Sequence, residues 1–168
     1  MTEEYTMNTT KVFLNTWGAY NNGSIGYGWM DSEEAKEFIE NNPERDGGEW
    51  FIADIDNYLG IKISSCDYCD VMEVLETIST LEDMQEWERD NMIALMEYLN
   101  TEDVQQAIDK QDEYIFYSDL DSYYDSCDES LDFTGCSEIL ERYFDYDAFH
   151  SDCEYDIFQA SNGVCILK

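Results

Sequence analysis

The N-terminal third of the chain alternates apolar segments with turn-forming residues. Residues 11–17 are rich in β-branched and aromatic side chains, which predicts a strand. The Asn-Gly pair at 22–23 is typical of a tight turn, so residues 25–30 are expected to complete a hairpin with that strand. Residues 50–53 predict a third strand.

A helix is expected between the second and third strands. Asp31 or Ser32 can cap its first turn through the side-chain oxygen. The sequence Asn-Asn-Pro at 41–43 should end this helix, because proline disfavours helical backbone at the residue before it. Together with the three strands, the helix predicts a small α+β module over residues 1–62.

The middle of the chain has helical periodicity. Apolar residues recur every three to four positions over residues 71–78, which predicts a helix with one apolar face. Thr80 and Asp83 resemble the capped start of a second helix, and a third short helix is expected over residues 104–110. These elements predict a small helical bundle as a second module, over residues 63–110.

The last third of the chain returns to strands. Residues 114–117 predict a strand. Residues 121–131 and 137–149 predict two helices, with Gly135 between them as a typical C-cap. A closing hairpin is expected over residues 155–167, where two apolar segments flank an Asn-Gly turn.

These patterns together predict an α+β protein made of three small modules in a row, the last an α+β module over residues 111–168. The hydrophobic fraction of 43% and the aromatic fraction of 15% are sufficient for packed cores. The four tryptophans are expected to pack there: Trp17, Trp29, Trp50 and Trp87.

Charge changes the functional interpretation. The chain has 40 Asp and Glu residues against 8 Lys and Arg residues, a net charge of −32. Such charge destabilises a compact state, and solubility requires far less of it, so we expect the charge to have a use. B-DNA carries one negative charge per ~1.7 Å, so 32 charges correspond to about 54 Å of duplex. This density favours an elongated molecule with an acidic, DNA-like surface.

The acids are densest after residue 62. Residues 63–88 contain eight acids and no base, and residues 111–141 contain ten acids and no base. We interpret these stretches as carboxylates that imitate DNA phosphates. The candidates are Asp67, Asp70, Glu73, Glu76, Glu82, Asp83, Glu86, Glu88, Asp112, Glu113, Asp119, Asp121, Asp125, Asp128, Glu129 and Asp132.

Catalytic and metal-binding patterns are weak in this sequence. A single histidine, His150, limits acid–base chemistry, and no phosphate-binding glycine motif occurs, so we expect neither an enzyme nor a cofactor. The CxxC at 66–69 lacks the second pair that a zinc site needs. Calcium binding is an alternative function, but the loop that begins at Asp54 has its glycine late and Ser65 in place of a bidentate glutamate.

The expected compartment is the cytoplasm of a bacterial host cell. The N-terminus has no secretion signal, and no apolar run approaches the ~20 residues of a membrane span. Six cysteines without such a signal fit a reducing environment. Neither nucleic acid nor an anionic membrane is an expected partner, because both would repel a chain of this charge.

A segment near the N-terminus resembles a known family. Residues 13–31 resemble the opening of the ArdA antirestriction proteins, which has a strand, an aromatic residue, Tyr-Asn-x-Gly and then Trp-hydrophobic-Asp. The Ser-Asn-Gly-Val sequence at 161–164 and the Tyr-Ser-Asp sequence at 117–119 are also similar. The matching residues of the opening are Tyr20, Asn21, Gly23, Gly28, Trp29 and Asp31.

The resemblance implies a fold and a partner. It implies three modules in an elongated chain with a curved DNA-like surface, a homodimer formed by the C-terminal module, and binding to the methyltransferase core of type I restriction–modification enzymes. The family's antirestriction motif would fall around Ser122–Gly135. An inhibitor of another DNA-handling defence system, for example of CRISPR type, is an alternative. The candidates for dimer contact or module core are Tyr123, Phe144, Tyr146 and Phe149.

Overall fold

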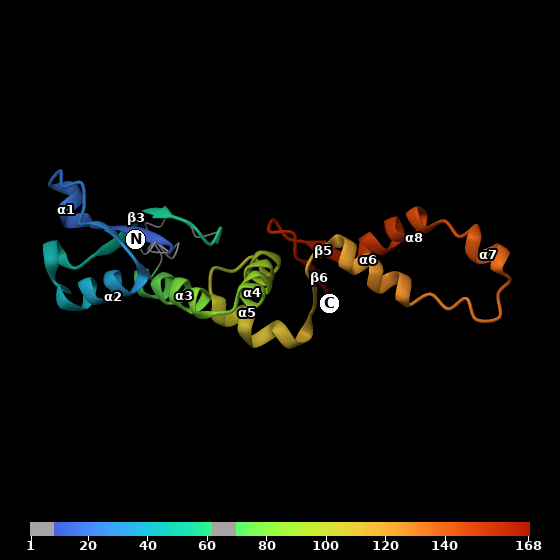
Figure 1. The fold of residues 1–168 in the computed structure, drawn as a ribbon. Coiled ribbons are helices and arrows are strands. Elements are labelled where there is room, and N and C mark those ends of the chain that lie inside the picture. The colour runs from blue at the N-terminus through green and yellow to red at the C-terminus, as the bar shows by residue number, and fades with distance from the viewer. Residues whose placement is uncertain (1–8, 62–69) are drawn as a thin grey trace, which may run out of the picture. The chain divides into compact units, whose positions relative to one another are not determined.

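The structure of the protein is a computed structural model that describes residues 9–61 and 70–168. It is a mixed α+β fold, as predicted, with two three-stranded antiparallel sheets and their helices (Figure 1). The chain forms two compact units. The first unit contains the residues up to 85 together with 102–105, and the second contains 86–101 and 106–168. The predicted bundle over 63–110 is thus divided between them, and the arrangement in three modules remains a prediction.

The sheet of the first unit is built around β1 (Lys11–Thr16). This strand lies between β2 (Gly28–Met30) and β3 (Trp50–Asp56), and both neighbours run antiparallel to it. The three predicted strands are therefore confirmed, with β3 longer and β2 shorter than expected. Core side chains of β1 and β3 include Val12, Leu14 and Ile52, all at most 2% exposed.

The predicted antiparallel pairing of the first two strands is confirmed, but the predicted tight turn between them is wrong. A short helix, α1 (Trp17–Asn21), separates β1 from β2. The Thr16 hydroxyl accepts a hydrogen bond from the Ala19 amide and so caps a helical turn immediately after the strand. The Asn-Gly pair ends this helix, with Gly23 at a φ of 80°, instead of joining two strands directly.

The helix that follows β2 agrees closely with its sequence signals. Helix α2 (Ser32–Asn41) begins at an Asp31 cap, where the Asp31 carboxylate and the Glu34 side chain form a capping box. It ends at Asn42, before the proline, as predicted. The helix packs against β1 and against α3, and Ser79 donates a hydrogen bond of 2.8 Å to Glu33 across the two helices.

Helix α3 (Val71–Asp83) buries the predicted apolar face, which includes Leu75 and Ile78. The predicted start of the next helix at Thr80 and Asp83 is wrong, because both residues belong to α3. Burial of Leu81 continues the same apolar face and carries the helix past this start signal. The next helix, α4 (Glu86–Leu99), begins three residues after α3 ends.

The sheet of the second unit has its central strand last in sequence. Strand β6 (Cys165–Leu167) lies between β4 (Ile115–Tyr117) and β5 (Ile157–Gln159), antiparallel to both. The predicted closing hairpin is confirmed, and Gly163 adopts the positive φ of 92° that its turn requires. The sheet packs against α4 through β6.

Hydrogen bonds fix the turn of this hairpin to α4. Glu97 of the helix accepts bonds of 3.0 Å from the Ser161 amide and 2.7 Å from its hydroxyl. The Asn162 side chain donates a bond of 2.9 Å to the Asp90 carbonyl. Residues about 60 to 70 positions apart in sequence are therefore joined by polar contacts.

The remaining helices of the chain are short. Helix α5 (Val104–Lys110) and helix α6 (Leu120–Glu129) occur close to their predicted places. The predicted helix over 137–149 is wrong as a single element, because it is divided into α7 (Glu138–Arg142) and α8 (Tyr146–Cys153). Asp145 caps α8 by accepting a bond from the Ala148 amide, which starts a new helix there. Gly135 lies in the loop between α6 and α7, with a φ of 84°, and not at a helix C-cap.

Candidate functional site

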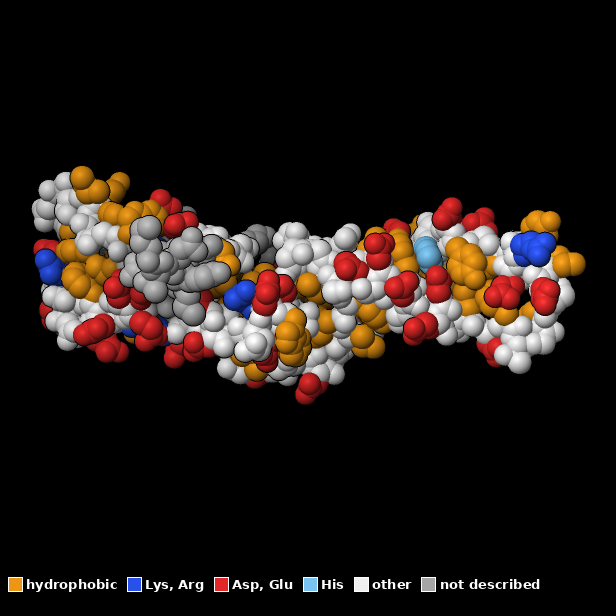
Figure 2. Space-filling model, viewed as in Figure 1, with side chains coloured by type: hydrophobic (Ala, Val, Ile, Leu, Met, Phe, Trp, Pro, Cys, Tyr) orange, Lys and Arg blue, Asp and Glu red, His pale blue; other side chains and the backbone are white. Residues whose placement is uncertain are grey.

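The carboxylates predicted to imitate phosphates lie mainly at the surface of the units. Of the fifteen candidates that the structure describes, twelve are exposed, and Glu82, Glu88 and Asp128 are half-buried. Asp67 lies outside the described residues. Acidic side chains are spread over the visible face of both units (Figure 2). The candidates divide between the two units.

Four of these carboxylates also hold the local backbone. They accept hydrogen bonds of 2.7–2.9 Å from main-chain amides. The sequence interpretation gave them only a role toward a partner, although Asp at a helix start is a known capping signal. The four are Asp70 at the start of α3, Asp119 at the start of α6, Asp132 in the loop after α6, and Glu82, which binds the Thr10 amide.

Hydrogen bonding keeps two of these groups charged. The amide and the side chain of Ser122 lower the pKa of Asp119, because both donate to its ionised form. The hydroxyl and the amide of Thr134 lower the pKa of Asp132 in the same way. Both carboxylates therefore stay ionised below the pH at which an ordinary aspartate is protonated.

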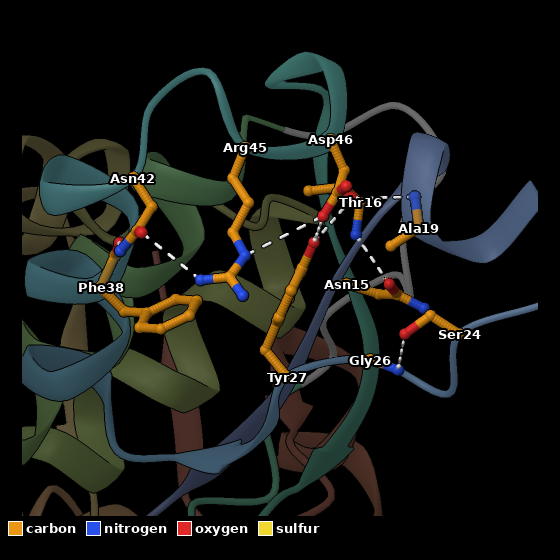
Figure 3. Close-up of polar contacts among 10 residues, drawn as sticks. All are labelled: Asn15, Thr16, Ala19, Ser24, Gly26, Tyr27, Phe38, Asn42, Arg45 and Asp46. Atoms are coloured by element: carbon orange, nitrogen blue, oxygen red, sulfur yellow. Dashed lines mark hydrogen bonds and ion pairs between the residues drawn. The ribbon is translucent and has the colours of Figure 1, made fainter. Parts of the chain in front are cut away.

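An exposed arginine in the first unit lies against two aromatic rings (Figure 3). The guanidinium carbon of Arg45 lies 4.8 Å from the ring centroid of Tyr27 and 5.7 Å from that of Phe38. Its Nη1 donates to the Asn42 side chain at 3.4 Å, and its Nε lies 3.9 Å from a carboxylate oxygen of Asp46. The same oxygen accepts a hydrogen bond from the Tyr27 hydroxyl. We call these five residues the Arg45 site.

The turn that contains Arg45 and Asp46 lies in close contact with α1. A Cβ atom at Gly18 would lie 1.8 Å from the Asp46 carbonyl oxygen, so only glycine fits this position. Asp46 itself adopts a left-handed φ of 48°, which aspartate tolerates better than most residues. The site is thus held from two sides, by the rings and by the close approach of α1.

An open cleft in the second unit was not predicted. It has a volume of about 350 Å³ and lies between the first turns of α4 and the segment 111–116. Trp87, which was expected in the core, is 68% exposed. We call this feature the Trp87 cleft; its walls are Trp87, Glu88, Asn91, Met92, Gln111, Asp112, Tyr114 and Phe116.

The prediction that all four tryptophans pack in the core is wrong for two of them. Trp17 stacks on Phe51 and is half-buried, and Trp50 is half-buried too. Trp29 is 47% exposed, and Trp87 is more exposed still. The buried residues of α4 are concentrated over 92–96, so its first turn has little of the core to pack against.

The single histidine joins two helices. His150 on α8 lies 2.7 Å from the Asp128 carboxylate on α6 and stacks on the Tyr124 ring at 4.2 Å. The Tyr124 hydroxyl donates to Glu154, and this bond raises the pKa of Tyr124 to about 12. These contacts explain why Asp128 is less exposed than most other candidate acids, and they give the histidine a packing role.

Neither a metal-binding cluster nor a membrane-spanning helix occurs among the described residues. Residues 9–61 and 70–168 contain no group of three or more His, Cys, Asp or Glu side chains placed to hold a metal ion. The calcium alternative gains no support, because Asp54 and Asp56 lie within strand β3; Ser65 and the CxxC at 66–69 lie outside the described residues. None of the described helices combines the length and the apolar character needed to cross a bilayer.

Comparison with known families decides the assignment. The family model of the antirestriction protein ArdA matches residues 12–166, a span that runs through both units. The chain belongs to the ArdA family. ArdA membership implies antirestriction activity, since these proteins are inhibitors and not enzymes, and it implies interaction with restriction enzymes. A search of curated proteins found no match.

The residues expected to form the ArdA dimer contact have unequal surroundings. Tyr123 is buried, and its hydroxyl donates to the Cys153 carbonyl at 2.9 Å, so it packs within the second unit. Phe144 and Phe149 are half-buried and contact each other edge to face. Tyr146 is 37% exposed and also contacts Phe144.

A more exposed apolar set lies nearby on α7. Ile139, Leu140 and Tyr143 are between 60% and 79% exposed. We call these three residues the α7 face. In Figure 1 this helix lies beyond α6 and α8 at one end of the second unit. The sequence predicted a helix that contains these residues, but it gave no signal that the chain leaves them uncovered. The segment 122–135, where the resemblance to the family led us to expect the antirestriction motif, runs from α6 into the loop before this helix.

Proposed function

We propose that this ArdA chain inhibits type I restriction–modification enzymes by occupying the DNA-binding cleft of their methyltransferase core. The observation that carries the proposal is the net charge of −32 together with twelve exposed carboxylates among the fifteen described candidates. Carboxylates at the surface attract the lysine and arginine side chains that otherwise bind phosphates and release DNA counterions. The hydroxyl and amide donors that fix phosphates can bind carboxylates as well.

The proposed inhibitor imitates the backbone of DNA and not its bases. Sequence is read through base edges in the grooves, whereas phosphate contacts only position a protein on the duplex. Inhibition is therefore expected to be independent of the recognition sequence of the target enzyme. A comparison of type I enzymes with different recognition sequences, at equal salt, tests this independence.

The active form is proposed to be a homodimer. Two copies related by a twofold axis carry twice the charge of one and suit an enzyme that reads two half-sites. The α7 face supplies an exposed apolar surface on the C-terminal part of the chain, and such surfaces often mark protein interfaces. We propose Ile139, Leu140, Tyr143 and Tyr146 as dimer contacts. The half-buried Phe144 and Phe149 would support these contacts from the interior of the second unit.

The binding energy is proposed to be distributed over many carboxylates. Single exposed ion pairs contribute little, so one Asp→Asn or Glu→Gln change should weaken inhibition only slightly. The loss of inhibition should grow with the number of acids neutralised, and it should be large when many acids of one face are neutralised together. A single substitution of a surface Asp that abolished inhibition without unfolding the chain would contradict this distribution.

The experiment that tests the proposal is binding of the purified protein to a type I methyltransferase complex. Binding is measured across a salt series, with and without competing DNA duplex, in the absence of calcium. The expected result is competition with the duplex and a linear fall of log K with log salt. An absence of binding at low salt would refute this target, and inhibition of another DNA-handling system would then have to be tested.

A further inference from the structure

We propose that the Trp87 cleft binds an arginine side chain of the enzyme that this chain inhibits. The inference rests on the proposed function for the identity of the partner. The site itself can be tested without that partner, because its chemistry is defined by the residues of the second unit alone.

The walls of the cleft combine aromatic rings with carboxylates. Trp87 offers an indole that is 68% exposed, and Tyr114 and Phe116 line the same space. Glu88 and Asp112 add two carboxylates, and the volume of about 350 Å³ is within the range of small-molecule pockets. A planar cation satisfies both kinds of wall, since it is attracted to ring faces and to carboxylate oxygens.

The first unit shows how this chain itself accommodates such a cation. In the Arg45 site, two rings, one carboxylate and one side-chain amide contact a guanidinium. The Trp87 cleft contains the same three kinds of group, with Asn91 and Gln111 as the amides. The difference is that the first unit supplies its own arginine, whereas Trp87 remains largely exposed to solvent.

A cation already approaches one wall of the cleft. The ammonium of Lys168 lies 5.8 Å from the ring centroid of Tyr114, within the distance at which a ring attracts a cation. An arginine suits the cleft better than a lysine does. Its guanidinium stacks flat on an indole and binds a carboxylate through two parallel hydrogen bonds, and a lysine ammonium does neither.

The occupant is expected to come from a DNA-binding surface. Arginine is a principal phosphate ligand of such surfaces, and a net charge of −32 attracts them. Exposed tryptophans are also among the residues that most often dominate the energy of protein interfaces. The cleft therefore adds one directional contact to an interaction that is otherwise distributed over carboxylates.

The first test uses the full chain and a small probe. The indole N–H signals of the ¹⁵N-labelled protein are followed by NMR during titration with acetyl-Gly-Arg-Gly-amide, and the Trp87 signal is identified by its loss in Trp87→Phe. The matched probe replaces arginine with citrulline, which has nearly the same shape and no charge. We expect the arginine peptide to shift the Trp87 signal and the citrulline peptide to leave it unchanged.

Trp29 is the internal control of this titration, because it is exposed but lies in the first unit. Equal shifts of the Trp29 and Trp87 signals, or equal effects of the two peptides, would overturn the proposal. A Trp87 shift in a protein that fails to bind a type I methyltransferase would support the cleft and refute only the proposed target.

The second test measures binding to the methyltransferase complex. Glu88→Gln with Asp112→Asn removes two charges from the cleft, and Glu73→Gln with Asp125→Asn removes two exposed charges elsewhere. We expect the cleft pair, and Trp87→Ala, to weaken binding at least about tenfold, and the control pair less than about threefold. Equal weakening by both pairs would mean that only total charge matters, and it would overturn the proposal.

Discussion

The two units of the molecule use aromatic and charged side chains in different ways. In the first unit, the guanidinium of Arg45 lies against the rings of Tyr27 and Phe38, and the turn beside them is in close contact with Gly18. In the second unit, Trp87 lines an open cleft and the α7 face is exposed. The first unit thus completes its aromatic site from its own chain, whereas the second leaves apolar surface that a partner can cover. We infer that the Arg45 site serves the stability of the first unit, whereas the Trp87 cleft and the α7 face serve recognition.

The largest expected effect comes from the two cores. Leu14→Ala in the first unit and Leu95→Ala in the second remove fully buried side chains, and each should lower the free energy of unfolding by roughly 2–5 kcal/mol. Hydrogen exchange read by mass spectrometry should show lost protection in the unit that carries the substitution. Equal loss in both units would mean that they unfold together, and the comparison between them would fail.

The next effect concerns association of the second unit. Leu140→Asp places a charge on the α7 face of both copies and removes the burial of two leucines, each worth about 1.5–3 kcal/mol, so the dimer dissociation constant should rise at least about 100-fold. Sedimentation measures the change. Glu138→Gln on the same helix is the control and should leave the dimer intact. Because Leu140 is 60% exposed, the melting temperature of the monomer should hardly change.

A smaller effect is expected at the Arg45 site. Arg45→Met removes the contact with the rings and should lower the stability of the first unit by about 0.5–1.5 kcal/mol. Arg142→Met, at an exposed position, changes the net charge equally and serves as the control. Chemical denaturation compares the two. Similar effects of both substitutions would show that the lost charge, and not the lost contact with the rings, determines the change in stability.

The smallest effect is local and depends on pH. The pKa of Asp119 is lowered in the folded state, so its stabilising contribution is complete above the ordinary aspartate pKa and is lost as the pH falls through the lower folded value. Amide exchange at Ser122, expressed relative to the intrinsic exchange rate at each pH, should quicken over that acidic range. In Asp119→Ala this exchange should already be fast at neutral pH. An unchanged Ser122 signal throughout the titration would disprove the cap.

Local signals in the sequence were sufficient for much of the fold. The Asp31 cap, the apolar face around Leu75 and the Asn-Gly hairpin before β6 all depend on residues close in sequence, and all three are present. The errors arise where two local signals compete. Thr16 caps α1 where a hairpin was expected, and Asp145 divides a helix that its apolar pattern makes continuous.

The candidate site was less accessible from the sequence. An apolar pattern is the same whether its face meets the chain's own core or another molecule, so exposure of Trp87 and of Leu140 had no local signal. A carboxylate at a helix start can either cap the helix or face a partner. Asp119 caps its helix, because it accepts a hydrogen bond from the Ser122 amide. Which acids form one continuous face depends on the arrangement of the units, and this stays a prediction.

The position of β6 has a consequence for cotranslational folding. Strand β4 is synthesised about 50 residues before its partner, which at about 5–20 residues per second is a delay of roughly 3–10 s. During that time the second unit lacks both the central strand of its sheet and the hairpin turn that binds Glu97. All three strands of the first sheet are synthesised before this delay begins. A message cut short before codon 165 would therefore yield a second unit without a sheet, however complete its acidic residues.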